Sequence, residues 1–180
     1  MTSHHSTRRV QSLILRAALV TVIGGTAVQP IAAETEIPPV THIRTSSPGL
    51  AELMRDATAR SMTFQQLVDT INGTDGIVYV EEGTCGHSVR ACLMLSLAIS
   101  GPYRLLYVRV NRRNGNWDLQ GSIGHELRHV IEVLSSPAVR SSADMYYFYQ
   151  REGFPRFGTF ETDAALHAGD AVRDELRARR

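Results

Sequence analysis

The feature that most constrains the fold of this chain is an apolar stripe between Asp118 and Leu134 that repeats with the period of an α-helix. Its members lie three or four residues apart and share one helical face: Leu119, Ile123, Leu127, Val130, Ile131 and Leu134. Because this face must pack against other elements, the stripe also determines which residues point the other way. The opposite face carries Ser122, His125, Glu126 and His129.

The rest of the chain predicts one α+β domain. Its 180 residues, 43% hydrophobic and 21% charged, are typical of a single globular domain. Further helices are expected over residues 48–60, 64–71, 137–150 and 160–177, with Ser47, Thr63, Ser136 and Thr159 as their respective caps. Strands are expected over 76–81, 90–99 and 103–111, and we expect them to form a small antiparallel sheet. A net charge of +1 offers no broad basic surface, so nucleic acid is not an expected partner.

The N-terminus has the pattern of a secretory signal peptide over residues 1–33. Arginines at positions 8 and 9 precede an apolar stretch over residues 17–28, and small residues end at Ala33. A charged residue and two glycines interrupt the apolar run, whereas a spanning helix needs about 20 apolar residues. An uncleaved anchor is the alternative. We therefore expect an exported protein, periplasmic or secreted, without stable membrane insertion after cleavage. Residues 34–47 are expected to be extended, and residues 48–180 to form the folded domain.

The chain contains two cysteines, Cys85 and Cys92, which flank the expected turn between the first two strands. In an oxidising compartment a disulfide between them can persist, and it would staple that hairpin. The alternative is two small buried thiols.

The polar face of the central helix carries a pattern that predicts a zinc site. His125 and His129 are four residues apart, so their imidazoles project from one face of the helix, one turn apart. Glu126 lies on the same side and can reach a water molecule next to the metal. Zinc lowers the pKa of such a water toward ~7, and the carboxylate can take its proton as the water attacks a carbonyl.

In these residues the segment Ile-Gly-His-Glu-Leu-Arg-His-Val-Ile resembles the active helix of the zincin metalloproteases. The resemblance implies a zincin-like fold, bound Zn²⁺ and hydrolysis of a peptide or protein substrate, with Glu126 as general base and His125 and His129 as metal ligands. Arg128 departs from the family pattern, which usually has an uncharged residue at this position.

A catalytic zinc needs a third protein ligand. The metzincin branch requires Gly and His where this chain has Glu132 and Ser135, so the chain is more similar to the gluzincins, in which a Glu on a downstream helix completes the site. Glu161 is the best candidate, because it shares a face of the expected last helix with several alanines. The gluzincin Asp four residues later is absent, since position 165 is Ala. Other candidates for the third ligand are Asp144, Glu152, Asp163 and His167.

Two other functions fit the same sequence. One is an exported zincin-like binding or structural protein without hydrolytic activity. In the other, the protein binds no metal, and the histidines lie on a helix face that is exposed to solvent. No residue could be assigned to transition-state stabilisation among His87, Tyr146, Tyr147 and Tyr149.

Overall fold

The computed structural model describes residues 41–86, 89–112, 117–156 and 159–178, so the expected signal peptide lies outside the described residues. The elements in chain order are β1 (Ile43–Arg44), α1 (Pro48–Arg60), α2 (Met62–Asn72), β2 (Gly76–Glu82), β3 (Ala91–Ser100), β4 (Tyr103–Val110), α3 (Trp117–Leu134), α4 (Ser142–Glu152), β5 (Phe154–Arg156), β6 (Thr159–Glu161) and α5 (Asp163–Ala178). This is the α+β class expected from the sequence. Among the described helices, none combines the length and the apolar character that crossing a membrane requires.

The main sheet is mixed, which corrects the antiparallel sheet expected from the sequence. Its strand order is β1-β2-β4-β3, in which β1 and β4 run parallel to β2, and β3 runs antiparallel to β4. The expected hairpin between β2 and β3 is therefore wrong, because β4 lies between them. Apolar side chains explain the order. Val78 and Val80 of β2 and Leu106 and Val108 of β4 are fully buried, whereas most of β3 is not and it takes the edge.

Cys85 and Cys92 form a disulfide, as the exported context favoured. The bridge closes the loop that leads from β2 into β3 and ends on the second residue of β3. It therefore anchors the start of an edge strand rather than stapling a hairpin of two paired strands.

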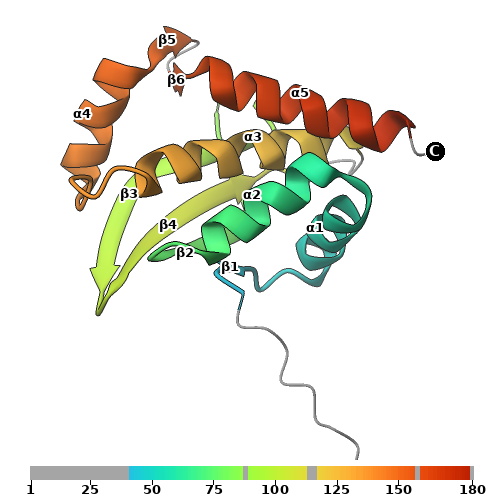
Figure 1. The fold of residues 1–180 in the computed structure, drawn as a ribbon, viewed down its shortest axis with the longest axis horizontal. Coiled ribbons are helices and arrows are strands. Elements are labelled where there is room, and N and C mark those ends of the chain that lie inside the picture. The colour runs from blue at the N-terminus through green and yellow to red at the C-terminus, as the bar shows by residue number, and fades with distance from the viewer. Residues whose placement is uncertain (1–40, 87–88, 113–116, 157–158, 179–180) are drawn as a thin grey trace, which may run out of the picture. The chain divides into compact units, whose positions relative to one another are not determined.

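The helix α3 packs against the sheet, and α5 runs alongside it (Figure 1). The predicted apolar stripe is buried along its whole length. Glycines allow α3 and α5 to approach closely. A Cβ added at Gly124 would lie 3.0 Å from Val172, and one added at Gly169 would lie 3.0 Å from the Cβ of His125. The backbone of α5 thus packs directly against the helical turn that carries the first histidine.

The start of α1 agrees with the expectation from the sequence, whereas the starts of three other helices differ from it. Ser47 caps α1 as expected, accepting a hydrogen bond from Leu50 N at 3.3 Å. Three expected caps are wrong: α2 is capped by Ser61 instead of Thr63, α4 by Ser141 instead of Ser136, and α5 begins at Asp163, with Thr162 as its cap instead of Thr159. In each pair both residues have hydroxyl groups, and tertiary contacts select the one that is used.

The C-terminal end of α3 is held by a buried arginine of β4. Arg104 is 3% exposed, and its guanidinium donates to the carbonyls of Val133, Leu134, Ser136 and Val139 at 2.7–3.3 Å. It also forms an ion pair with Asp75, with a closest distance of 2.6 Å, and this hydrogen bond lowers the pKa of that carboxyl group. One side chain therefore connects carbonyls of the last turn of α3 with carbonyls of the segment that follows it.

Arg104→Met is expected to lower the free energy of unfolding by about 3–5 kcal/mol, because it leaves buried carbonyls and a carboxylate without their donor. Urea denaturation followed by circular dichroism measures the loss. Arg109→Met, an exposed position on the same strand, is the matched control and should change stability by less than about 0.5 kcal/mol. A loss below 1 kcal/mol in the Arg104 variant would contradict this structural role.

Candidate metal centre

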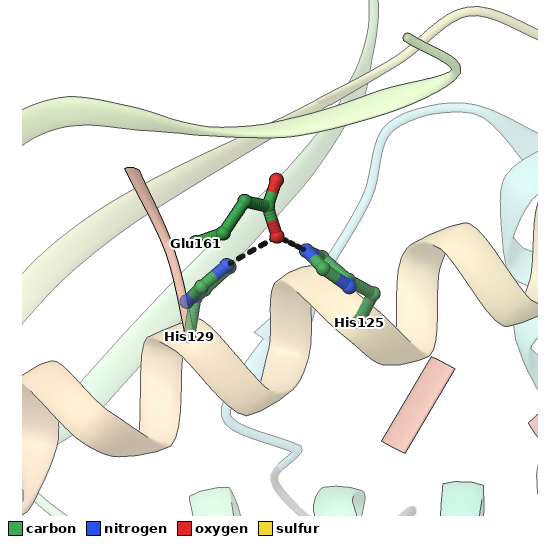
Figure 2. A group of neighbouring side chains, drawn as sticks. All are labelled: His125, His129 and Glu161. Atoms are coloured by element: carbon green, nitrogen blue, oxygen red, sulfur yellow. Dashed lines mark ion pairs between the residues drawn. The ribbon is translucent and has the colours of Figure 1, made fainter. Parts of the chain in front are cut away.

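Three of the residues singled out in the sequence come together at one point. Glu161 Oε2 lies 3.0 Å from His125 Nε2 and 3.9 Å from His129 Nε2. Figure 2 shows this carboxylate oxygen placed between the two imidazole rings, which project from successive turns of α3. One ligand atom from each residue lies within 4.8 Å of the others, so the group could hold one metal ion.

Glu161 reaches this point from a strand, which corrects its expected position on the last helix. Residues 154–156 and 159–161 pair as the antiparallel hairpin β5-β6, and Glu161 pairs with Phe154 at its end. The next residue, Thr162, caps α5 by accepting a hydrogen bond from Ala165 N at 3.1 Å. The carboxylate of Glu161 is therefore held where a strand turns into a helix, and hydrogen bonds constrain the backbone on both sides of it.

The three donor atoms could hold a metal ion. Bond lengths of about 2.0–2.2 Å in a tetrahedral zinc site would place ligand atoms about 3.3–3.6 Å apart, and Glu161 Oε2 lies 3.0 and 3.9 Å from the two imidazole nitrogens. Glu161 Oε2 is buried, and within the described ranges no group donates a hydrogen bond to it, despite its distance of 3.0 Å from an imidazole nitrogen. A buried oxygen without a donor is rare in folded proteins. A cation at the meeting point of the three side chains would satisfy it.

The site is not a solvated helix face. The exposed fractions of the side chains are 13% for His125, 5% for His129 and 16% for Glu161. Surface histidines without a role remain largely in water, whereas these rings are covered and face an acidic side chain. The geometry therefore disfavours the alternative in which the histidines only face solvent.

Glu126 lies beside the three side chains but turns one of its oxygens away from them. Its Oε2 accepts a hydrogen bond from the backbone N–H of Leu93 on β3 at 2.7 Å, and its Oε1 lies 3.9 Å from His125 Nε2. Burial raises the pKa of this carboxyl group, and the nearby imidazoles oppose the shift. One oxygen is thus anchored to the edge strand while the other remains available on the side of the histidines.

Charges within the group shift the pKa values of two other members. Burial alone would lower the pKa of His129, but its hydrogen bond to Glu132 and its proximity to Glu161 and Glu126 raise the pKa to about 9. Burial alone would raise the pKa of Glu161, but the two imidazoles lower it to about 2. Without a metal, the group is therefore held together at neutral pH by a protonated histidine and ionised carboxylates.

In the metal-free protein, His129 and Glu161 together are expected to contribute most to stability between about pH 4.5 and 6.5. The raised pKa of His129 contributes stability that is complete below 6.5 and is lost as the pH rises through 9. The lowered pKa of Glu161 contributes stability that is complete above 4.5 and is lost as the pH falls through 2. Between pH 6 and 9 we expect a loss of about 1–3 kcal/mol.

Thermal unfolding of chelator-treated protein across this pH range measures the loss, and His129→Gln should flatten the profile above pH 6. An unchanged melting temperature from pH 6 to 9 in the unsubstituted protein would contradict the shift.

A cleft of about 670 Å³ opens onto the group. Its walls include the disulfide, Leu93, Met94 and Leu95 of β3, Phe160 of β6 and Leu166 of α5. A larger but more open hollow of about 890 Å³ lies between α1 and the ends of β2 and β4, and none of the three converging side chains lines it. We associate function with the first cleft, because it alone of the two contains the histidines.

The remaining candidates lie elsewhere. Asp144 accepts hydrogen bonds at the start of α4, Glu152, Asp163 and His167 are exposed, and His87 lies outside the described residues. Tyr149 is buried and donates to the carbonyl of His129 at 2.8 Å, which braces the helix. Tyr146 and Tyr147 are exposed.

Sequence reasoning missed two contributors to this site, the amide of Leu93 and the carboxylate of Glu132. Glu132 lies one helical turn after His129 and could have been found from that spacing. Comparisons with protein-family models, curated proteins and solved structures each returned no match.

Proposed function

We propose that this protein is an exported zinc-dependent metallopeptidase, in which His125, His129 and Glu161 hold the metal and Glu126 is the general base. The observation that carries the proposal is the convergence of two imidazole nitrogens and a buried, otherwise unsatisfied carboxylate oxygen beside a second buried carboxylate. Three protein ligands are characteristic of catalytic zinc sites, whereas structural zinc sites are usually closed by four.

Bound zinc would polarise a substrate carbonyl and make a water molecule acidic enough to attack it near neutral pH. Oε1 of Glu126 faces the histidines and would accept the proton of the attacking water. The same carboxyl group would then pass the proton to the leaving amine. The hydrogen bond from Leu93 N–H to Oε2 keeps the side chain oriented during both transfers.

The cleft favours an extended peptide as substrate. Among the described strands β3 pairs only with β4, and residues 91–95 line the cleft, where the N–H of Leu93 is already used by Glu126. A peptide can add to such an edge through main-chain hydrogen bonds, while apolar walls accommodate its side chains. Export is supported by the disulfide together with the sequence pattern of residues 1–33.

The proposal is tested on protein purified without a histidine tag. Hydrolysis of a mixed peptide library, followed by mass spectrometry, should be lost after treatment with a chelator and restored by about one equivalent of zinc. Zinc binding without cleavage of any peptide would instead favour the exported binding protein. Absence of bound zinc after reconstitution would exclude the peptidase and a binding protein that uses the metal.

A further inference from the structure

Glu132 contacts both segments that carry the ligands, although it is too far along the helix to join the metal group itself. Its Oε2 lies 2.9 Å from His129 Nδ1, and its Oε1 accepts a hydrogen bond from Thr162 Oγ1 at 2.7 Å. Its side chain is 12% exposed. Thr162 directly follows Glu161, so one half-buried carboxylate connects the second histidine to the residue next to the third ligand.

The contact with His129 decides how that imidazole can be used. A carboxylate can only accept a hydrogen bond at this position, so the ring carries its proton on Nδ1. In the neutral imidazole this leaves the lone pair on Nε2, the nitrogen that faces Glu161 Oε2. The ring is also kept from rotating, because its other nitrogen is tied to Glu132.

The contact with Thr162 affects the position of Glu161, the third candidate ligand. The Thr162 hydroxyl donates to Glu132 and accepts from Ala165 N, so it ties the first turn of α5 to α3. This holds the corner at which Glu161 ends β6. Arg128, the residue that departs from the zincin pattern, lies 3.8 Å from Glu132 Oε1 and partly balances its charge. Arg128 and Glu132 therefore form an ion pair next to the three candidate ligands.

We propose that Glu132 is a positioning residue that sets the metal-binding tautomer of His129 and, through Thr162, the location of Glu161. This inference rests on the proposed zinc site. It assigns a role to the residue that occupies the position of the metzincin glycine. Loss of a residue that hydrogen-bonds to a metal ligand typically weakens metal binding about 10- to 100-fold.

The test compares zinc affinities, measured by competition with a chromogenic chelator. Glu132→Ala should raise the dissociation constant for zinc about 10- to 100-fold. Glu175→Ala is the matched control: like Glu132, Glu175 connects two segments, here by accepting hydrogen bonds from the hydroxyl groups of Ser61 and Thr63 at the other end of α5. It should lower stability and leave zinc affinity within about twofold of the unsubstituted protein.

Two further measurements separate positioning from a general loss of structure. Thr162→Val should weaken zinc binding, whereas Thr162→Ser, which retains the hydroxyl, should restore it; this pair carries the test if Glu132→Ala does not fold. In the proton spectrum of the zinc-loaded protein, one downfield imidazole N–H resonance should disappear in Glu132→Ala and persist in Glu175→Ala.

Unchanged zinc affinity in Glu132→Ala, or in Thr162→Val where the first variant does not fold, would overturn the role of Glu132 and leave the metallopeptidase proposal intact. If the unsubstituted protein bound no zinc, the metal site and this inference would both be wrong. Equal weakening by Glu132→Ala and Glu175→Ala would show a stability effect and would also refute the proposal.

Discussion

Glu126→Gln is expected to lower the rate of peptide hydrolysis by about 10²- to 10⁴-fold while zinc remains bound, because the amide cannot take a proton from the attacking water. The change preserves the shape of the side chain. The amide oxygen can still accept the hydrogen bond that Leu93 N–H donates to Glu126, so the helix and the edge strand should keep their contact. The three side chains that meet at the metal position are not altered.

The measurement is kcat on a peptide that the unsubstituted protein cleaves, together with zinc content by elemental analysis. Glu52→Gln, an exposed position on α1, is the control and should have the kcat of the unsubstituted protein. Full activity in the Glu126 variant would refute its role as general base. Loss of zinc in the same variant would mean that Glu126 supports the metal site instead.

Glu161→Ala is expected to abolish stoichiometric zinc binding and, with it, hydrolysis. The variant removes the only carboxylate in the converging group, and two imidazoles alone do not complete a catalytic zinc site. The zinc dissociation constant should rise more in Glu161→Ala than the roughly 10- to 100-fold rise expected in Glu132→Ala, because Glu161 would bind the metal directly. The metal-free form should still fold, because Glu161 lies at the end of a short hairpin outside the apolar core.

Equilibrium dialysis against buffered zinc measures the loss, with circular dichroism as the check on folding. Asp163→Ala, two residues later and exposed, is the matched control and should retain one zinc per chain. Retention of stoichiometric, tightly bound zinc in Glu161→Ala would show that another residue supplies the third ligand.

Much of the local structure followed from sequence patterns. The period of the apolar stripe predicted α3 to within one residue, and it placed His125 and His129 on the face away from the stripe. The three strands β2, β3 and β4 were located to within one or two residues. Such features depend on the spacing of apolar residues within one segment, so each can be predicted from that segment alone.

The element that carries Glu161 could not be predicted in the same way. The hairpin β5-β6 consists of two strands of three residues, one of which contains Pro155, and so short a pattern has no periodicity to detect. The predicted helix therefore began too early. Glu161 was selected as a candidate, but on the assumption that it shared a helix face with alanines.

The sequence by itself determined the helical register of α3 and the pairing of two imidazoles on one of its faces, because a helix repeats every 3.6 residues whatever surrounds it. Only the tertiary structure decided the strand order β1-β2-β4-β3, the convergence of Glu161 on the histidines, the contact of Leu93 with Glu126 and the contact of Glu132 with Thr162. These depend on packing between segments about 30 residues apart, where burial of apolar faces and satisfaction of buried polar atoms select one arrangement among many that local patterns allow.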